Sequence, residues 1–327
     1  MAMRTFIEAI REGLAEEMRR DPTTIVLGED VGKKGGVFLA TDGLWAEFGD
    51  ERVIDTPLTE SMIVGASIGA AANGLRPIPE IQFADFIFPA FNQIVSEAAR
   101  MRYRSNNAFG CPITIRAPYG GGVHGALYHS QSVEAYFTHV PGLKVVVPST
   151  PYDAKGLLLS AIRDDDPVLF FEHKKMYRSV RGDVPDGEYA IPLGKAQITH
   201  PGTQVTVVAY GLMAHYALEA ADRVAEEGIS VEVVDLRTLR PLDTETLLGS
   251  VRKTGKCLIV YEDNKFGGYG AEVAAIVAEE AFDYLDGPVI RIAGPEVPGV
   301  PYNHVLEDWF MVDPEKIADG IRRLAAY

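Results

Sequence analysis

Acidic and aromatic residues follow several short apolar segments in the first half of the sequence. They occur in Gly28-Glu29-Asp30, in Pro57-Leu58-Thr59-Glu60 and from Gln82 to Phe86, and a glycine-rich segment with a histidine extends from Gly120 to Ser132. Open α/β sheets bind their ligands beyond the carboxyl ends of the strands. We therefore expect binding and catalysis at these four segments, because the second half of the sequence has fewer loops with such side chains.

Taken alone, Glu60 and His129 each allow two interpretations. A carboxylate at position 60 could move a proton, but an acid at the start of a helix is also favoured by the helix dipole. His129 could act as an acid or a base, yet a loop histidine is more often a hydrogen-bonded surface residue. His124, His129 and His139 do not share a helical face, so their spacing does not indicate a metal site made of histidines.

The glycines of the segment Gly120-Gly-Gly-Val-His-Gly125 formally match the Gly-x-Gly-x-x-Gly fingerprint of dinucleotide-binding proteins. That fold also needs a strand that ends in an acidic residue about 20 residues further on, and the sequence offers none. We interpret these glycines as positions where the backbone passes close to a bulky group.

Helical and strand-like patterns alternate along the sequence. A capping box of Thr5 and Glu8 opens the first helix, and a long helix is expected over residues 88–104. Short apolar runs separated by helices are typical of a parallel sheet covered on both faces. We predict an α/β fold with two domains, joined by a linker rich in proline and glycine. The predicted bounds are 1–185 for the first domain, 186–202 for the linker and 203–327 for the second domain.

Composition excludes several classes of protein. The sequence has 31 basic and 46 acidic residues, and its net charge of −15 disfavours nucleic acid as a partner. Its two cysteines, Cys111 and Cys257, have no paired spacing, which fits a reducing compartment. No apolar run is long enough to cross a membrane. We therefore expect a cytoplasmic protein that binds neither nucleic acid nor membrane.

Several motifs together resemble the E1 β subunits of 2-oxo acid dehydrogenases. Their order and spacing match over almost the whole sequence, and the match weakens in the last thirty or so residues. The motifs are Gly28-Glu-Asp-Val-Gly, Asp55-Thr-Pro-Leu-Thr-Glu60, Glu80-Ile-Gln-Phe-Ala-Asp-Phe-Ile-Phe-Pro89, His129-Ser-Gln-Ser132, Pro141-Gly-Leu-Lys-Val145, Asp153-Ala-Lys-Gly156 and Val234-Asp-Leu-Arg-Thr238-Leu-Arg-Pro241.

This resemblance implies a pyrimidine-binding domain followed by a transketolase C-terminal-like domain, with thiamine diphosphate as the cofactor. Glu60 matches the carboxylate that binds the pyrimidine ring of the cofactor, and His129 matches a histidine near the substrate and the incoming lipoyl group. Phe83, Phe86 and His129 match positions near the substrate, although many branched-chain relatives carry Tyr at the position of Phe86. The positions that match the cofactor site are Glu29, Leu58, Thr59, Glu60, Gln82, Phe86, Ile87, Phe88 and Pro89.

The resemblance also implies a structural potassium site, as some relatives have. The alternative is that Asp164 and Asp166 are solvated loop acids, and Asp166 stands where several relatives have Asn. The matching positions are Cys111, Ile113, Thr114, Ala161, Asp164 and Asp166.

A partner chain follows from a missing motif. Thiamine enzymes hold Mg²⁺ and the diphosphate with a Gly-Asp-Gly segment, which this sequence lacks. The resemblance therefore implies an E1 α subunit that supplies this segment, in a heterotetramer of two α and two β subunits. A lipoyl-bearing E2 transacylase would then receive the acyl group.

The sequences of the motifs most resemble those of branched-chain 2-oxo acid dehydrogenases, which implies a substrate of the 2-oxoisovalerate type. Pyruvate and acetoin dehydrogenases share the same frame and remain alternatives. Two further alternatives are a non-catalytic α/β nucleotide-binding protein and a stand-alone transketolase. Retention of Glu60 and His129 argues against the first, and the lack of a diphosphate-binding segment argues against the second.

Overall fold

The computed structural model describes residues 1–327 and forms two compact units, which confirms the predicted α/β class with two domains. The first unit comprises Met1–Tyr119 and Tyr136–Leu193, and the second comprises Gly120–Ala135 and Gly194–Tyr327. Residues 120–135, which we assigned to the first domain, thus pack with the second. The stretch 186–202 is also not a simple linker, because it contains strand β9 (Gln197–His200), which pairs with β11.

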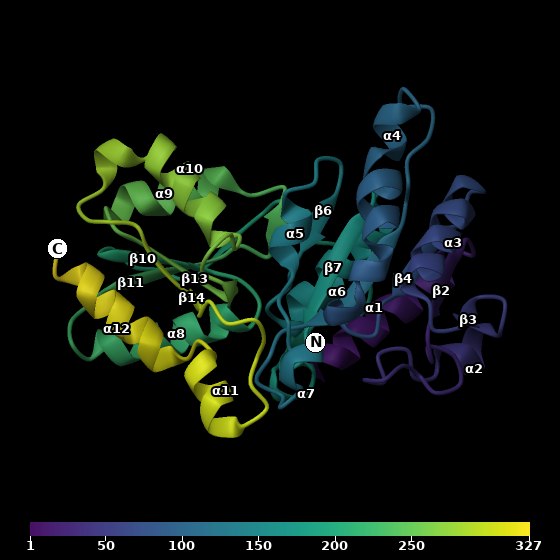
Figure 1. The fold of residues 1–327 in the computed structure, drawn as a ribbon, viewed down its shortest axis with the longest axis horizontal. Coiled ribbons are helices and arrows are strands. Elements are labelled where there is room, and N and C mark those ends of the chain that lie inside the picture. Colours follow the sequence, from purple (N-terminus) through teal and green to yellow (C-terminus); the bar gives the residue numbers. More distant parts are fainter. The chain divides into compact units, whose positions relative to one another are not determined.

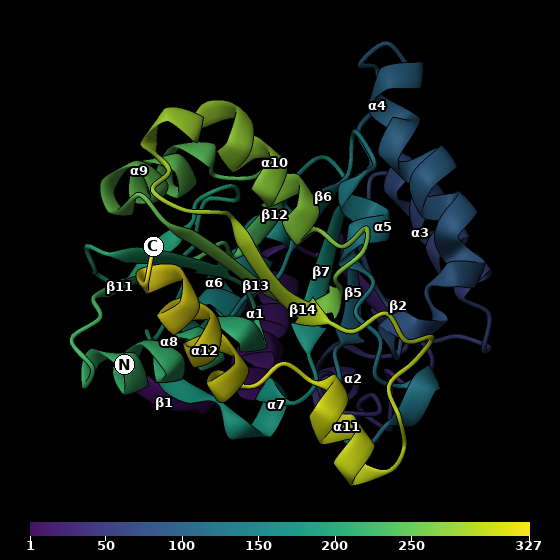
Figure 2. The same cartoon turned by 60° about the vertical axis from the view of Figure 1, so that its left-hand side comes forward.

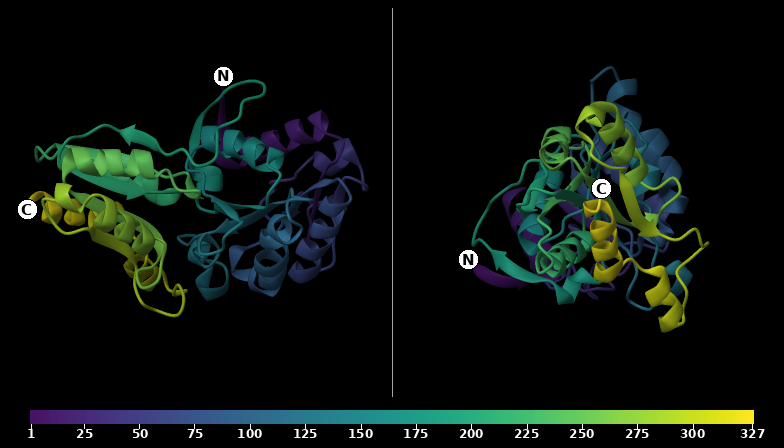
Figure 3. Two further views of the ribbon diagram at one scale, coloured as in Figure 1. Left: turned by 90° about the horizontal axis from the view of Figure 1, so that it is seen from above. Right: turned by 90° about the vertical axis from the view of Figure 1, so that its left-hand side faces the viewer.

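The first unit is built on a parallel sheet, in which its strands follow the order β6-β7-β5-β4-β2-β3. A separate antiparallel pair joins β1 to β8, and Figure 3 shows these two arrows side by side near the N-terminus. The strands are β1 (Ala2–Thr5), β2 (Thr24–Gly28), β3 (Val53–Asp55), β4 (Arg76–Glu80), β5 (Thr114–Tyr119), β6 (Lys144–Val146), β7 (Val168–His173) and β8 (Arg181–Val184).

Helix α1 (Phe6–Arg20) begins at the predicted capping box. The Thr5 amide donates to the Glu8 carboxylate at 2.7 Å, and the Glu8 amide donates to Thr5 Oγ1 at 3.4 Å. The apolar face of α1 is fully buried and packs against α6. The other α-helices of this unit are α2 (Leu44–Phe48), α3 (Glu60–Ala72), α4 (Met101–Arg104), α6 (Pro151–Arg163) and α7 (Met176–Ser179), while α5 (Glu134–Thr138) begins in the second unit and ends in the first.

The prediction of one regular α-helix over residues 88–104 is wrong, because the segment is irregular. The segment consists of the short helices η2 (Phe88–Ala90), η3 (Gln93–Glu97) and η4 (Ala98–Arg100), followed by α4. Segment η3 is a π-helix, and the Ala98 amide donates to the carbonyls of both Gln93 and Ile94. Such one-turn π segments widen a helix locally without ending it.

The second unit is a three-layer α/β domain. Its sheet has the order β14-β13-β10-β11-β9, in which only β9 is antiparallel. Figure 1 shows α9 and α10 on one face of this sheet and α8 and α12 on the other. The elements are β10 (Val205–Ala209), α8 (Leu212–Ala225), β11 (Val231–Asp235), β12 (Thr238–Arg240), α9 (Thr244–Thr254), β13 (Cys257–Asn264), α10 (Gly270–Glu280), β14 (Ile290–Gly294), α11 (His304–Phe310) and α12 (Pro314–Ala325). No helix of either unit is long and apolar enough to span a membrane.

Candidate active site

Three strands of the first unit end at the same level. Gly28 at the end of β2 is paired in register with Asp55 at the end of β3 and with Glu80 at the end of β4. The segments that follow these strands therefore leave the sheet at one edge, where ligands of parallel sheets bind. Three of the four segments singled out in the sequence thus start side by side.

Glu60 and Glu29 form an acidic pair at this edge. Glu60 is the first residue of α3, and both side chains are half-buried. Burial raises the pKa of the Glu29 carboxyl above its usual range, and the nearby charges of Asp30 and Glu60 raise it further. Gln82 Nε2 donates to the Glu29 carbonyl at 3.4 Å. The structure thus brings together Glu29, Glu60 and Gln82 from three separate segments.

An aromatic cluster follows Gln82. The rings of Phe83 and Phe86 meet edge to face, with centroids 5.6 Å apart, and Phe38 contacts Phe83 at 5.3 Å. The ammonium group of Lys174 lies 5.6 Å from the centre of the Phe83 ring. Both Phe83 and Phe86 are half-buried, so each ring keeps part of its surface accessible.

The remaining predicted cofactor positions differ in exposure. Leu58 is 70% exposed, Phe88 is 38% exposed and packs edge to face on Tyr136, and Pro89 is exposed. Ile87 is fully buried, so its side chain belongs to the core of the unit. Thr59 caps α3 through its backbone, without a side-chain hydrogen bond. Leu58, Phe88 and Pro89 are therefore predicted apolar positions with surface available to a ligand or a partner.

A buried charge network lies within the sheet, and sequence reasoning missed it. Arg116 of β5 donates to Glu80 at 2.5 Å and to both oxygens of Glu172 at 2.6 and 2.7 Å, and the Tyr177 hydroxyl donates to Glu172 at 2.7 Å. Burial raises the pKa of the Glu80 carboxyl, while Arg116 opposes that rise. Charged residues inside otherwise apolar strands were the signal for this network, because such residues need partners when buried.

His129 lies in the second unit, in the segment Gly120–Ala135, which we call the His129 segment. Its side chain is half-buried and follows the short helix η5 (Ala126–Tyr128). No α-helix starts at Gly125, so the segment lacks the strand-turn-helix form of a dinucleotide site. A Cβ on Gly125 would lie 2.6 Å from the His129 carbonyl oxygen, which confirms that this glycine permits a close approach.

The comparisons with known proteins divide the chain between residues 180 and 194 and include residues 120–135 in the first domain. Residues 2–180 match the transketolase pyrimidine binding domain, and residues 194–317 match the transketolase C-terminal domain. The 2-oxoisovalerate dehydrogenase subunit beta of Bacillus subtilis is 58% identical over the full length of both chains. The pyruvate dehydrogenase E1 component subunit beta of the same organism is 51% identical over 90% of this chain and 91% of its own. This chain belongs to the E1 β subunits of 2-oxo acid dehydrogenases.

A solved structure supports the fold of this E1 β subunit. It is described as a split gene transketolase, an inactive beta4 tetramer, and it covers 98% of both chains with a TM-score of 0.78 and 25% identity. The fold predicted from the motifs, a pyrimidine-binding domain followed by a transketolase C-terminal-like domain, is therefore confirmed.

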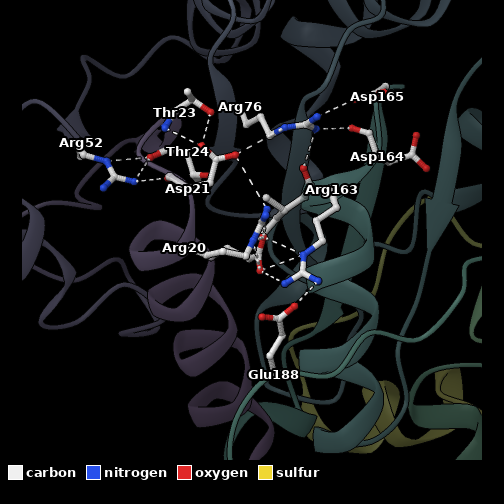
Figure 4. A network of polar contacts seen from close by, with 12 residues as sticks. Arg20, Asp21, Thr23, Thr24, Arg52, Arg76, Arg163, Asp164, Asp165 and Glu188 are labelled. Atoms are coloured by element: carbon white, nitrogen blue, oxygen red, sulfur yellow. Dashed lines mark hydrogen bonds and ion pairs between the residues drawn. The ribbon is translucent and has the colours of Figure 1, made fainter.

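Two of the positions predicted for potassium in this E1 β subunit are paired with basic side chains of the chain itself. Asp164 binds Lys144 Nζ at 2.5 Å, and Asp166 binds Arg102 at 2.5 Å. Figure 4 shows Arg76 reaching the same turn, where it donates to the Asp164 carbonyl at 3.0 Å and binds the Asp165 carboxylate at 2.6 Å.

The remaining potassium positions contribute little charge. Burial raises the pKa of the Cys111 thiol to about 12, so it stays neutral. The carbonyls of Cys111, Ile113 and Ala161 each accept a backbone hydrogen bond, and Thr114 is buried in β5. No cluster of His, Cys, Asp or Glu suited to a metal ion is present. Both carboxylates already hold a cation of the chain and offer little free charge to a potassium ion, and the potassium site, which the resemblance builds mostly from backbone carbonyls, stays a prediction.

Proposed function

We propose that this E1 β subunit takes part in the oxidative decarboxylation of a branched-chain 2-oxo acid of the 2-oxoisovalerate type. The acyl group then passes to the lipoyl group of an E2 transacylase. The observation that carries the proposal is the acidic pair Glu29 and Glu60 at a sheet edge, beside the partly accessible rings of Phe83 and Phe86.

This site fits the pyrimidine half of thiamine diphosphate. An aromatic ring with a basic nitrogen needs an apolar surface and a carboxylate that can hold a proton, and the half-buried Glu60 and Phe86 offer both. When bound, thiamine diphosphate supplies the carbon nucleophile and the electron sink for decarboxylation. Glu60 would hold the proton that moves to and from the ring nitrogen. Glu29 places a second carboxyl beside it, and burial and the nearby acids raise the pKa of that carboxyl.

Partner subunits complete the site in this proposal. The sequence contains no Gly-Asp-Gly segment for Mg²⁺ and diphosphate. An E1 α subunit would supply it, in a heterotetramer of two α and two β subunits. The exposed side chains of Leu58 and Phe88 beside the site are apolar surface that a bound cofactor and partner would cover.

The choice of substrate rests on the relatives. Identity is higher to the 2-oxoisovalerate dehydrogenase subunit than to the pyruvate dehydrogenase subunit, and it extends over the full length. Pyruvate, which the second relative's name points to, and acetoin are the alternatives. Rates of the assembled enzyme on 2-oxoisovalerate, pyruvate and acetoin decide between them. We also propose a reducing, cytoplasmic location, because Cys111 and Cys257 are both free and buried.

The direct test is Glu60→Gln in the enzyme assembled with its α subunit. The amide keeps the shape of the side chain but cannot take up the proton, so we expect 2-oxo acid-dependent dye reduction to fall at least about tenfold. Tetramer assembly should be unchanged, and Glu51→Gln, at an exposed position of the same unit, should have no effect. Near-normal turnover of Glu60→Gln would remove Glu60 from the mechanism. No thiamine-dependent rate of the unmodified enzyme with any 2-oxo acid would favour a non-catalytic nucleotide-binding protein.

A further inference from the structure

The His129 segment is folded in a conformation that its own residues disfavour. His124 and Ala126 have φ angles of +58° and +52°, in the left-handed region that glycine normally occupies. A non-glycine residue in this region is strained and persists only when the surrounding structure holds it. The contacts that hold this segment in the second unit therefore decide where His129 lies.

Glu262 of β13 binds residues near both ends of the His129 segment. Its Oε1 atom accepts the Gly121 amide at 2.6 Å and the Ser132 hydroxyl at 3.2 Å. The Gly120 amide also donates to the Gln131 carbonyl at 3.0 Å, so the two ends lie side by side. Because Glu262 is only 6% exposed, these hydrogen bonds to its carboxylate are shielded from water.

Glu307 of α11 binds the His129 segment nearer its middle. It is 1% exposed, accepts the His124 amide at 3.1 Å and contacts His124 Nδ1. Figure 2 shows α11 at the end of the long connection that follows β14. Met311, just after α11, comes so close to Gly121 that a Cβ there would lie 2.9 Å from its sulfur. The chain from α11 to Met311 therefore holds the strained His124 and also packs against Gly121, near the start of the His129 segment.

Within the His129 segment, short contacts connect the residues held by Glu262 and Glu307 to the backbone at His129. A Cβ on Gly125 would lie 2.6 Å from the His129 carbonyl oxygen and 2.9 Å from Ser130 Oγ. Gln131 Nε2 donates to the Leu127 carbonyl at 3.0 Å. The backbone around His129 thus has little freedom as long as residues 121, 124 and 132 are held.

We propose that Glu262 and Glu307 are positioning residues for His129, through which the C-terminal domain controls acyl transfer to the lipoyl group. The inference rests on the proposed function, and on the resemblance that places His129 near the incoming lipoyl group. In this proposal neither glutamate acts on the reacting atoms. Each fixes the backbone of the segment from which the imidazole extends, and a displacement of about 1 Å in such a group can cost on the order of a hundredfold in rate.

The test separates the two half-reactions of the assembled enzyme. Oxo acid-dependent dye reduction reports decarboxylation, and acylation of an isolated lipoyl domain reports transfer. We expect Glu262→Leu to lower the kcat of lipoyl acylation at least about tenfold, while dye reduction stays within about twofold. Glu262→Gln keeps an acceptor for the Gly121 amide and should recover part of the loss. Glu262→Leu should add no further loss to His129→Ala, because both changes remove the same contribution.

Glu232→Leu is the matched control. Glu232 is a buried glutamate of the same unit that accepts the backbone amide of Gly202 at 3.3 Å and binds Lys253, away from the His129 segment. If Glu262→Leu and Glu232→Leu reduce both half-reactions alike, Glu262 only stabilises the fold and the proposal is wrong. Acylation at the unmodified rate in Glu262→Leu, or losses that add to those of His129→Ala, would also overturn it.

Hydrogen exchange gives a readout that does not depend on catalysis. In Glu262→Leu the amides of residues 121–132 should exchange at least about tenfold faster, while those of β10 and β11 keep their protection. Unchanged exchange in 121–132 would refute the positioning role even if the enzyme proved inactive. A lack of thiamine-dependent activity in the unmodified enzyme, with exchange behaving as expected, would instead refute the proposed function alone.

Discussion

The buried network around Arg116 allows a sharp test of how charge contributes to this fold. Replacing Arg116 with Met removes three hydrogen bonds, of 2.5 Å to Glu80 and of 2.6 and 2.7 Å to Glu172. Arg116 and Glu172 are fully buried and Glu80 is 5% exposed. Water therefore cannot replace the lost partner, and two carboxylates are left in a low-dielectric environment.

The cost follows from that geometry. Removing one partner of a buried ion pair costs about 3–5 kcal/mol, which for a domain of this size lowers the melting temperature by about 6–20 °C. Burial already raises the pKa of Glu80, so this carboxyl takes up a proton easily once Arg116 is gone. Near pH 5.5 we therefore expect the loss in melting temperature to lie in the lower half of this range. A larger loss should appear near pH 8, where protonation is less favourable.

The assay is thermal unfolding of Arg116→Met beside Arg322→Met. Arg322 on α12 also binds three carboxylates, those of Glu227, Glu315 and Asp319, all at 2.8 Å, but its side chain is 35% exposed. Water and salt weaken exposed ion pairs, so Arg322→Met should lower the melting temperature by much less than Arg116→Met. A triple variant with Glu80→Gln and Glu172→Gln should regain much of the loss in Arg116→Met. Equal losses in the two single variants would refute the reasoning from burial.

Two further predictions concern ions and protons. The melting temperature should be the same within about 1 °C in potassium, sodium and choline chloride at equal ionic strength, because Lys144 and Arg102 already bind Asp164 and Asp166. A saturable rise specific to potassium would show that the segment binds the ion. Burial, helped by the charges of Asp263 and Glu262, raises the pKa of Glu134 from 4.5 to about 8. The free energy of unfolding should therefore fall as pH rises from about 4.5 through 8. Glu134→Gln should be more stable than the unmodified chain at pH 8.5 but not at pH 4.5 in urea titrations, and an equal effect at both values would contradict this reasoning.

Local patterns were enough to predict the fold and one half of the site. The capping box at Thr5 and the alternation of apolar runs with helices depend on neighbouring residues, and the structure has both. The proximity of Glu29, Glu60 and Gln82 could be predicted because parallel strands end at one edge. Their catalytic and binding roles stay predictions, since they were inferred from the resemblance to the E1 β subunits.

Long-range features could not be read from the sequence. The His129 segment directly follows β5 in the sequence, yet it packs with the unit whose main part starts at Gly194. The hydrogen bond from Gly121 to Glu262 joins residues 141 positions apart, and no local pattern encodes such a distance. The same holds for Arg116, which meets Glu80 and Glu172 only after three strands have assembled. The π-helix at Gln93–Glu97 has no signal in the sequence that we recognise.

The chain passes from one unit to the other three times, after Tyr119, Ala135 and Leu193. The halves are thus not modules that can be cut and rejoined at one site. A recombination breakpoint between residues 186 and 202 would give the His129 segment of one parent the Glu262 and Glu307 of another. Chimaeras of related subunits should therefore inherit residues 120–135 together with the C-terminal domain.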